Sequence, residues 1–313
     1  MTNYNILITD GLDARGQSIL RAAGNVNYRE STPVDELINL IAEYDALIVR
    51  GQTRVTAAVM DAASRLKVIG RAGVGVDNID LEAAKKHNIT VVNAPSSTTM
   101  AVAELSFGLL LAVAREIPRA DADMKQGQWL KKEFEGVELN GKTLGVIGFG
   151  RIGTEVGKRA AAFGMNVVTY DPNVSEHELE HGNAEPVSLQ DLFAWSDFIS
   201  LHLPLNVQTR DLIGPQAFSQ MKDGVRIVST ARGGIIDETA LLAALNSGKV
   251  AGVALDVFEK EPPGLTELVS HPRVIATPHI GAQTTEAQSR AAEDIAYEVL
   301  AALEGKSLRW KVA

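Results

Sequence analysis

The chain has 313 residues, of which 45% are hydrophobic and 22% charged, a composition typical of folded globular proteins and unlike that of disordered or fibrous ones. Its net charge of −9 disfavours binding to nucleic acid or anionic lipid, and the absence of cysteine excludes disulfides, thiolate nucleophiles and Cys-ligated metals. The length favours two domains, and no apolar run is long enough to span a bilayer. We therefore expect a soluble, cytoplasmic protein without a metal site.

Four short apolar runs in the N-terminal third predict β-strands, and segments with helical spacing of apolar residues lie between them. Continuous apolar strands that alternate with helices are typical of a parallel sheet covered on both faces. This part of the chain therefore predicts a first α/β domain. The four runs are residues 4–9, 46–50, 66–70 and 90–93.

A second series of strands follows a long apolar helical stretch that begins after Pro95. Six strands with helical connections are enough for a complete dinucleotide-binding sheet. The last predicted helix, residues 285–303, has one apolar face that suits either domain. The six predicted strands are residues 143–147, 166–170, 197–201, 224–229, 250–255 and 274–276.

A glycine motif follows the first strand of the second series and precedes an apolar helix. Its spacing is Gly148-x-Gly150-x-x-Gly153, and the next predicted strand is followed by Asp171. In the dinucleotide-binding fingerprint such glycines allow a tight turn, close approach of pyrophosphate and close packing of the helix. A carboxylate at Asp171 binds ribose hydroxyls and repels a 2′-phosphate, so the motif predicts NAD rather than NADP. The alternative is a plain glycine turn in which Asp171 caps the chain before Pro172.

Three polar residues follow later predicted strands of the same series. Arg232, Glu261 and His279 each lie just beyond the carboxyl end of a strand. Because these ends face the ligand crevice of an open parallel sheet, the three side chains are expected to converge. An arginine binds a carboxylate and polarises a carbonyl, a histidine exchanges a proton with an alcohol, and a glutamate orients the imidazole and favours its protonated form.

Each of the three residues also has a plain structural interpretation. Arg232 alone fits a surface ion pair, Glu261 a solvated loop acid, and His279 a capping or core histidine. Only their joint placement at successive strand ends favours a catalytic site.

At this point the chain resembles the D-isomer-specific 2-hydroxyacid dehydrogenases, most closely the members that oxidise 3-phospho-D-glycerate. The matching motifs run in family order through nearly the whole chain. They are VR (49–50), GRAGVGVDN (70–78), NAP (93–95), AEL (103–105), GKTLG (141–145), GFGRIG (148–153), ARGG (231–234), ALDVF (254–258) and TPHIGA (277–282).

The resemblance implies an α/β architecture of two Rossmann-like domains, with an NAD-binding doubly wound parallel sheet inserted into a flavodoxin-like substrate domain. Residues 1–97 and 287–313 would form the discontinuous substrate domain, and residues 98–286 the NAD-binding domain. The family also implies a homodimer or higher homo-oligomer through the Rossmann domain.

The resemblance further assigns roles to matching residues. Arg232 would bind the substrate carboxylate and carbonyl oxygen, and Glu261 would pair with His279, the acid/base. The NAD-binding residues would be Val74, Gly148, Gly150, Arg151, Ile152, Gly153, Asp171, Pro204, Thr209, Thr230, Ala231, Arg232, Asp256, His279, Gly281 and Ala282. The substrate-binding residues would be Arg50, Gly51, Arg71, Gly73, Val74, Gly75 and Asn93.

Cations near strand ends of the first domain are candidates for binding a substrate phosphate. Arg50 and Arg71 are the stronger candidates, and Arg54 is a weaker one. The alternative interpretation of each is a solvated charge in a loop. Many relatives have Ser where this chain has Gly51, which removes one expected phosphate contact. Two further cations, Lys131 and Lys132, would add charge from a partner subunit.

The resemblance leads us to expect oxidation of 3-phospho-D-glycerate by NAD to 3-phosphohydroxypyruvate, the first step of phosphorylated serine biosynthesis. One alternative is an NADH-dependent reductase of glyoxylate, hydroxypyruvate or another 2-keto acid, which needs no phosphate site. An alternative of another class is an NAD(H)-sensing, corepressor-like protein that keeps the same Arg, Glu and His.

Overall fold

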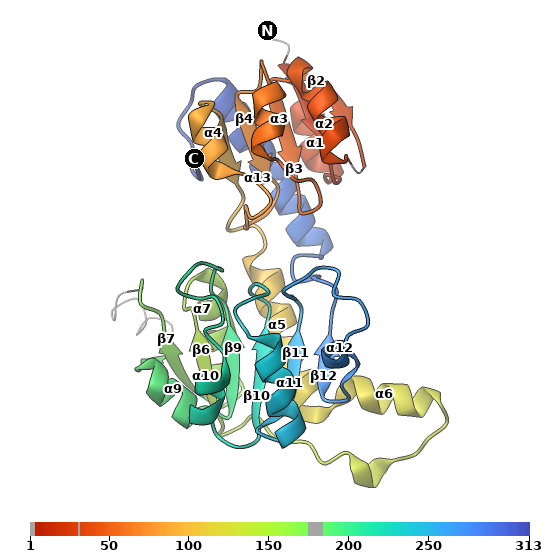
Figure 1. The fold of residues 1–313 in the computed structure, drawn as a ribbon, viewed down its shortest axis with the longest axis vertical. Coiled ribbons are helices and arrows are strands. Elements are labelled where there is room, and N and C mark those ends of the chain that lie inside the picture. Colours follow the sequence, from red (N-terminus) through yellow and green to blue (C-terminus); the bar gives the residue numbers. More distant parts are fainter. Residues whose placement is uncertain (1–3, 31, 175–183) are drawn as a thin grey trace. The chain divides into compact units, whose positions relative to one another are not determined.

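The computed structural model describes residues 4–30, 32–174 and 184–313, and the chain divides into two compact units (Figure 1). Unit 1 comprises Met1–Thr99 and Ala282–Ala313, and unit 2 comprises Met100–Gly281. Unit 2 is therefore a continuous insertion in unit 1. Each unit contains a parallel β-sheet with helices on both faces, which confirms the predicted α/β class.

Unit 1 has a five-stranded sheet in the order β2-β1-β3-β4-β5, the flavodoxin-like order. Its strands are β1 (Tyr4–Ile8), β2 (Gly24–Tyr28), β3 (Ala46–Val49), β4 (Val68–Arg71) and β5 (Thr90–Asn93). Its helices are α1 (Ala14–Arg21), α2 (Val34–Leu40), η1 (Ile41–Glu43), α3 (Ala57–Ala62), α4 (Leu81–Lys86) and α13 (Thr285–Leu303).

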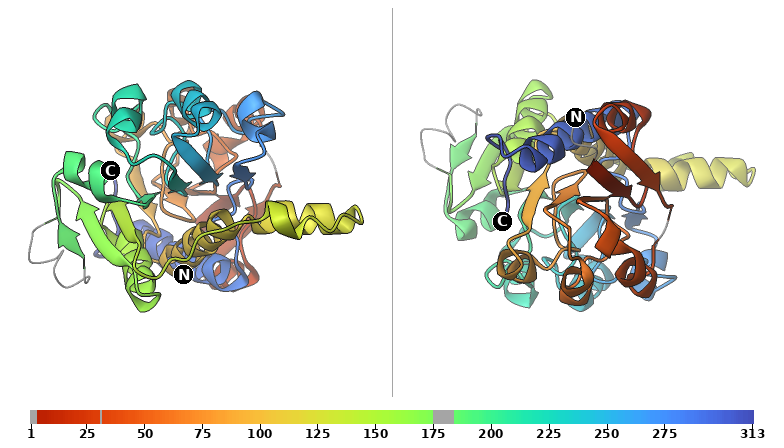
Figure 2. Two further views of the ribbon diagram at one scale, coloured as in Figure 1. Left: turned by 90° about the horizontal axis from the view of Figure 1, so that it is seen from below. Right: turned by 90° about the horizontal axis from the view of Figure 1, so that it is seen from above.

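Two apolar clusters hold the layers of unit 1 together. On one face of the sheet, Leu20 of α1 packs with Ile295 and Val299 of α13. On the other face, α2, α3 and α4 contribute Leu37, Val59 and Ala83, among others. Figure 2 shows α13 and the helices α2 to α4 on opposite sides of this sheet. The last helix of the chain is thus part of unit 1, and its predicted span is confirmed.

The fifth strand of unit 1 corrects the prediction of four. Strand β2 has the sequence GNVNY, and all its residues are at least partly exposed. It lies at the edge of the sheet, so it lacks the apolar run by which a strand buried on both faces is detected. The predicted strand at 66–70 begins two residues later, at Val68.

Unit 2 has a seven-stranded sheet in the order β12-β11-β10-β9-β6-β7-β8. Counted within the unit, this is the Rossmann order 3-2-1-4-5-6 with one further strand. Its strands are β6 (Thr143–Ile147), β7 (Asn166–Tyr170), β8 (Glu185–Pro186), β9 (Phe198–Leu201), β10 (Val225–Ser229), β11 (Val250–Leu255) and β12 (Val274–Ala276). Its helices are α5 (Thr99–Arg115), α6 (Ile117–Lys125), η2 (Lys131–Glu133), α7 (Arg151–Ala162), α9 (Leu189–Trp195), α10 (Pro215–Gln220), α11 (Glu238–Ser247) and α12 (Glu267–Ser270).

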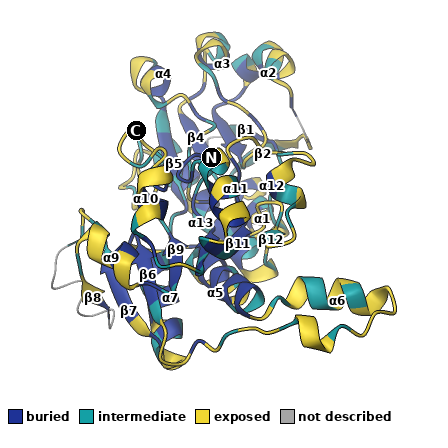
Figure 3. Ribbon diagram, turned by 60° about the horizontal axis from the view of Figure 1, so that its bottom comes forward, coloured by how far each residue is buried: buried dark blue, intermediate teal, exposed yellow. Residues whose placement is uncertain are grey.

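Helices α5 and α7 cover one face of this sheet, and α9 to α12 cover the other. In Figure 3 the central strands are buried while the outer faces of the helices are exposed. The six predicted strands are present, and the seventh, β8, is an exposed edge strand of two residues without an apolar signal. Helix α6 extends away from the rest of the unit (Figures 1 and 2).

Helix α5 is long and apolar, with nine buried residues. It is nevertheless too short to cross a membrane. No other helix in the described part of the chain is both long enough and apolar enough to do so.

Candidate active site

The glycine motif of unit 2 lies between β6 and α7, and its three glycines meet different steric demands. Gly148 has a φ of 91°, and a Cβ there would lie 2.6 Å from the His202 carbonyl oxygen. A Cβ on Gly153 would lie 2.1 Å from the Gly148 carbonyl oxygen, so α7 packs directly on the loop. A Cβ on Gly150 would meet nothing within 4 Å. The motif thus leaves open space at the N-terminus of α7, where a pyrophosphate is expected to bind.

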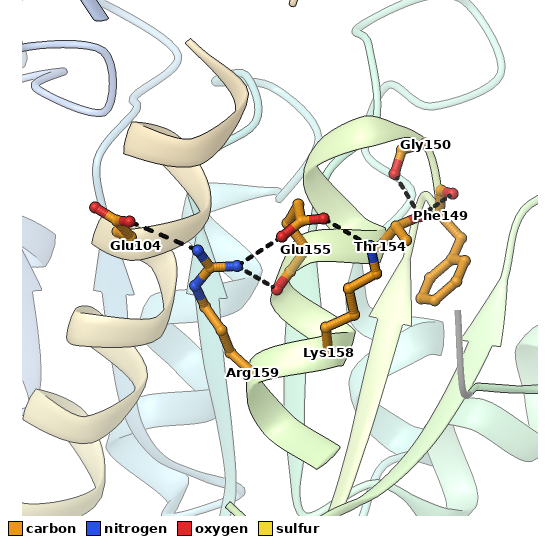
Figure 4. A network of polar contacts seen from close by, with 7 residues as sticks. All are labelled: Glu104, Phe149, Gly150, Thr154, Glu155, Lys158 and Arg159. Atoms are coloured by element: carbon orange, nitrogen blue, oxygen red, sulfur yellow. Dashed lines mark hydrogen bonds and ion pairs between the residues drawn. The ribbon is translucent and has the colours of Figure 1, made fainter. Parts of the chain in front are cut away.

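Polar contacts fix α7 to this loop and to α5 (Figure 4). Thr154 Oγ1 donates to the carbonyl oxygens of Phe149 (3.1 Å) and Gly150 (2.9 Å). Arg159 pairs with Glu155 on the same helix at 2.9 Å and with Glu104 of α5 at 3.6 Å. Hydrogen bonds from Lys158 and Arg159 lower the pKa of the Glu155 carboxyl and outweigh the opposing effect of burial. The first turn of α7, which includes Arg151 and Ile152, therefore has a fixed place beside the loop.

Asp171 follows β7 and contacts the glycine loop directly. Its Oδ2 accepts the Phe149 N–H at 2.8 Å, and its Oδ1 accepts the Asn173 N–H at 2.9 Å. The carboxylate therefore caps the chain, as the structural alternative for this residue requires. A carboxylate oxygen can accept more than one hydrogen bond, so this cap is compatible with ribose binding by Asp171.

Four more of the residues expected to bind NAD, Pro204, Thr209, Thr230 and Ala231, follow the neighbouring strands β9 and β10. Thr209 Oγ1 donates to the Pro204 carbonyl oxygen at 2.7 Å and so closes the loop after β9. Thr230 Oγ1 lies 2.7 Å from Ser106 Oγ of α5, a buried contact that fixes the start of the loop after β10. Ala231 follows it and is also buried.

The structure brings His279 and Glu261 together from loops that follow β12 and β11. His279 Nδ1 lies 2.7 Å from Glu261 Oε2, and Glu261 Oε1 accepts the Phe258 N–H at 3.1 Å. Burial raises the pKa of the Glu261 carboxyl, but the hydrogen bonds from His279 and Phe258 and the charges of His279 and Arg232 outweigh it, so its pKa lies below the ordinary 4.5. The carboxylate is therefore ionised wherever a histidine titrates.

Asp256 holds the loop that carries His279. It is 1% exposed, and its Oδ1 accepts Thr277 Oγ1–H at 2.6 Å and the Ile280 N–H at 2.9 Å. Its Oδ2 accepts the Gly281 N–H at 2.8 Å. His279 itself has a φ of 52°. Since asparagine, aspartate and histidine are the side chains that best tolerate this region, the loop suits the residue it presents.

Arg232 lies in the loop after β10, next to the loop that carries Glu261. A Cβ on Gly233 would lie 1.8 Å from the Phe258 carbonyl oxygen, so the two loops are in direct contact. The Arg232 side chain donates to the Ala231 carbonyl oxygen at 2.7 Å, and its charge helps to lower the pKa of Glu261. Three residues far apart in the sequence thus gather at the carboxyl edge of one sheet, as the strand-end argument predicts.

The substrate-binding candidates of unit 1 follow β3, β4 and β5. The Arg71 guanidinium lies against Gly73, since a Cβ there would be 1.5 Å from Arg71 Nη1. Asn93 Nδ2 donates to the Val74 carbonyl oxygen at 2.7 Å and so holds the segment from Gly73 to Gly75. A cation and a glycine-rich loop thus adjoin each other at the edge of this sheet.

Other candidates have different surroundings. Arg50 is half-buried, whereas Gly51 and Arg54 are exposed. Lys131 and Lys132 are exposed in η2 of unit 2. Ala282 was expected to bind NAD with Gly281, but it is the first residue of the chain's return to unit 1.

Sequence analysis misses His202, whose carbonyl oxygen adjoins Gly148 at the switch point between β6 and β9. Its Nε2 lies 2.8 Å from Ser200 Oγ, and burial lowers its pKa to about 3, so it stays neutral at physiological pH. Asp10, which binds the loop of Arg50, is missed as well. Both residues follow strands, so the argument applied to Arg232 would have singled them out.

Known proteins resemble this chain over most of its length. Residues 107–281 match the family model of the D-isomer specific 2-hydroxyacid dehydrogenase, NAD binding domain. The chain is 48% identical to a D-3-phosphoglycerate dehydrogenase of Rattus norvegicus over 304 residues, which are 97% of this chain and 57% of the relative. It is 49% identical to a hydroxypyruvate reductase of Thermotoga maritima over 294 residues, 93% of this chain and 95% of the relative.

A solved structure of D-lactate dehydrogenase from Aquifex aeolicus, complexed with NAD and lactic acid, superposes with a TM-score of 0.85 at 32% identity, covering 96% of both chains. This chain spans little more than half the length of the phosphoglycerate dehydrogenase relative. The family match covers the glycine motif and all three residues of the Arg, Glu and His cluster, and it identifies NAD as the cofactor of this domain. The chain therefore belongs to the D-isomer-specific 2-hydroxyacid dehydrogenase family.

Proposed function

We propose that this protein oxidises 3-phospho-D-glycerate to 3-phosphohydroxypyruvate with NAD, as the first step of phosphorylated serine biosynthesis. The observation that carries the proposal is the 2.7 Å pair of His279 and Glu261 beside Arg232, at the carboxyl edge of an NAD-binding sheet. The activity named for the Rattus norvegicus relative supports the choice of substrate.

The proposed chemistry assigns one task to each residue. When bound, NAD accepts the hydride that leaves the substrate carbon. Neutral His279 takes the hydroxyl proton, and Glu261 holds the imidazole through Nδ1 and stabilises the imidazolium that results. Arg232 binds the substrate carboxylate and polarises the carbonyl oxygen as it forms.

We assign cofactor binding to unit 2 and further contacts to the substrate, beyond those of Arg232 and His279, to unit 1. In unit 1, the N–H groups of Gly73 to Gly75 would bind the carboxylate, and Arg50 and Arg71 the phosphate, because a guanidinium makes paired charge-assisted bonds to such a group. Asn93 contributes by holding Val74. In unit 2, Gly148 to Gly153 would bind the pyrophosphate, and Asp171 the adenine ribose.

Substrate choice is tested with a panel of acids. Purified protein is expected to reduce NAD with 3-phospho-D-glycerate at a higher kcat/KM than with D-glycerate or D-lactate, and Arg50→Ala should lower only the first value strongly. NADH formation followed by absorbance measures this. Equal values for phosphorylated and unphosphorylated acids would contradict the proposal. They would favour hydroxypyruvate reduction, the activity named for the Thermotoga maritima relative.

Cofactor choice depends on Asp171. NAD is expected to be strongly preferred over NADP, and Asp171→Ala should weaken NADH binding about tenfold or more, since a hydrogen bond to a charged group contributes roughly 1.5–3 kcal/mol. Because Asp171 also caps the glycine loop, the NAD to NADP ratio of kcat/KM is the diagnostic quantity. Asp191→Ala, a change at an exposed carboxylate of the same unit, is the control. A ratio that Asp171→Ala leaves unchanged would place ribose selection elsewhere.

The His279 and Glu261 pair predicts how activity depends on pH. Oxidation requires neutral His279, so it should rise with pH, and reduction requires the protonated form, so it should fall. The lowered pKa of Glu261 keeps its carboxylate ionised through this range, so its charge can stabilise the imidazolium that forms during proton transfer. Glu261→Gln should therefore lower kcat/KM in both directions. Values of kcat/KM equal to those of wild type in both directions would show that Glu261 does not act on His279.

We further propose a cytoplasmic homodimer formed through unit 2. Ile117, Met124 and Trp129 lie on the segment that extends from this unit, with exposed fractions of 52%, 54% and 77%. Large apolar side chains at such exposure are typical of an interface. The absence of cysteine is compatible with a reducing compartment.

A further inference from the structure

The turn after β3, residues 50–53, is bound by a single carboxylate from the end of β1. Asp10 Oδ2 accepts the N–H groups of Arg50 (3.1 Å), Gln52 (3.1 Å) and Thr53 (2.8 Å). Asp10 Oδ1 accepts Thr53 Oγ1–H at 2.6 Å. One side chain thus binds four donors of a four-residue turn. The N–H of Gly51 is not among the donors that Asp10 binds, and a Cβ on Gly51 would meet nothing within 4 Å.

The carbonyl groups of the same turn are held by a second side chain. Asn78 Nδ2 donates to the carbonyl oxygens of Arg50 at 3.0 Å and Thr53 at 2.7 Å. The Asn78 carbonyl oxygen accepts the Val55 N–H at 2.8 Å, just beyond the turn. Asp10 and Asn78 therefore bind donors and acceptors of the turn, respectively, and set its conformation.

The Arg50 guanidinium is partly desolvated, and in the described part of the chain no carboxylate forms an ion pair with it. Its Nη2 donates to Gln283 Oε1 at 3.2 Å, a neutral partner from the segment that returns to unit 1. Burial lowers the pKa of Arg50, and the charge of Asp10 only partly offsets this. Two other arginines of unit 1 do have carboxylate partners, since Arg65 pairs with Asp45 and Arg309 with Glu298. A partly buried guanidinium whose side-chain partner is neutral favours binding of an anion, because a buried charge is stabilised by an opposite charge.

The position of the turn in the sheet also points to a ligand. Strand order reverses between β1 and β3, and ligands of open α/β sheets bind at such a switch point, beyond the carboxyl ends of the strands. Asp10 follows β1 there with a φ of 63°. Backbone strain in a residue that is not glycine is retained where surrounding contacts enforce it, often at binding sites.

We propose that Asp10 and Asn78 are positioning residues for the substrate's phosphate. They fix the 50–53 turn so that the Arg50 guanidinium and the Gly51 N–H are presented to the phosphate. This inference rests on the proposed function for its ligand, a phosphorylated 2-hydroxyacid. Neither residue contacts the reacting carbon, so each acts on substrate affinity through Arg50 rather than on the chemical step.

The test combines Asp10→Asn with Arg50→Ala in a double-mutant cycle. Asparagine keeps the size of Asp10 and one acceptor oxygen, but it removes the negative charge and replaces the other oxygen with a donor, so it weakens the bonds to the N–H groups of the turn. We expect Asp10→Asn to raise KM for 3-phospho-D-glycerate by about tenfold or more, the effect of one lost bond to a charged group. The kcat value and KM for hydroxypyruvate in the NADH-dependent reduction should change little. Asn78→Ala should show the same split.

Coupling distinguishes positioning from general destabilisation. If Asp10 acts through Arg50, Asp10→Asn should add little to the KM of Arg50→Ala, because contacting residues are not additive. Asp80→Asn is the matched control, since Asp80 caps α4 in the same unit and accepts one N–H, from Ala83 at 2.9 Å. Thermal unfolding of all variants and amide hydrogen exchange of residues 50–53 show whether only the turn is loosened.

Three results would overturn the inference. They are additive effects of the two substitutions, equal increases in KM for phosphorylated and unphosphorylated substrates, and unchanged exchange of the turn in Asp10→Asn. A wild-type protein that does not oxidise 3-phospho-D-glycerate contradicts the proposed substrate instead. The exchange measurement and the cycle, repeated with hydroxypyruvate, then decide whether Asp10 positions Arg50 for another anion.

Discussion

His279→Ala is expected to lower turnover by about 10²-fold or more while NADH still binds, because a positioned acid/base accelerates proton transfer by about that factor. The expected loss is local. Asp256 holds the loop through Thr277, Ile280 and Gly281, and none of these bonds involves the imidazole. Single-turnover rates and NADH titrations followed by tryptophan fluorescence measure the two effects separately.

The backbone at this position calls for a second variant. With a φ of 52°, alanine at 279 adds strain, whereas asparagine tolerates this conformation and also lacks a group that titrates near neutral pH. His279→Asn should therefore lose as much turnover as His279→Ala, with a smaller change in Tm. His271→Ala is the control, since this histidine belongs to the same unit and its side chain accepts the Arg273 N–H at Nδ1, away from the candidate active site. Turnover that survives in both His279 variants would exclude His279 as the acid/base.

Gly153→Ala is expected to lower both the stability of unit 2 and its affinity for NADH. The added Cβ would lie 2.1 Å from the Gly148 carbonyl oxygen and 3.2 Å from Val146 Cγ1, so α7 must move away from the loop. Overpacking of this kind costs about 1–3 kcal/mol. In a unit of this size Tm falls by about 2–4 °C for each kcal/mol. Calorimetric unfolding and NADH titration check both expectations.

Gly150→Ala separates the fold from the binding site. Its φ of −70° suits alanine and its Cβ would meet no atom within 4 Å, so Tm should not change. The methyl group would nevertheless enter the space assigned to pyrophosphate, and NADH affinity should fall. Gly108→Ala, at an exposed site within α5 with equally open surroundings, should leave affinity unchanged and raise stability by about 0.5–1 kcal/mol. NADH binding by Gly150→Ala that equals wild type would contradict the assignment of the pyrophosphate site.

Local patterns in the sequence are sufficient to predict the strands that are buried on both faces. Strands such as β6 and β11 are continuous apolar runs, and their predicted spans are confirmed. Their signal is strong because each side chain of a central strand enters an apolar layer. The glycine motif is equally local, since the turn, the close helix packing and the open N-terminus of α7 all arise within six residues.

Edge strands and contacts between loops could be recognised only in the tertiary structure. Strands β2 and β8 have exposed, polar sequences, so only pairing with β1 and β7 defines them. Asp10 resembles any aspartate of a turn until β1 and β3 become neighbours and the turn after β3 supplies its donors.

The candidate active site shows the same division. The sequence by itself determined which residues can do the chemistry, because strand-end positions and residue types place Arg232, Glu261 and His279 at one edge of a sheet. Only the tertiary structure decided that Asp256 holds the histidine loop and that the Arg232 loop packs on the Glu261 loop. The physical reason is that hydrogen bonds between loops depend on distances of a few tenths of an ångström, which periodicity and spacing along a chain do not specify.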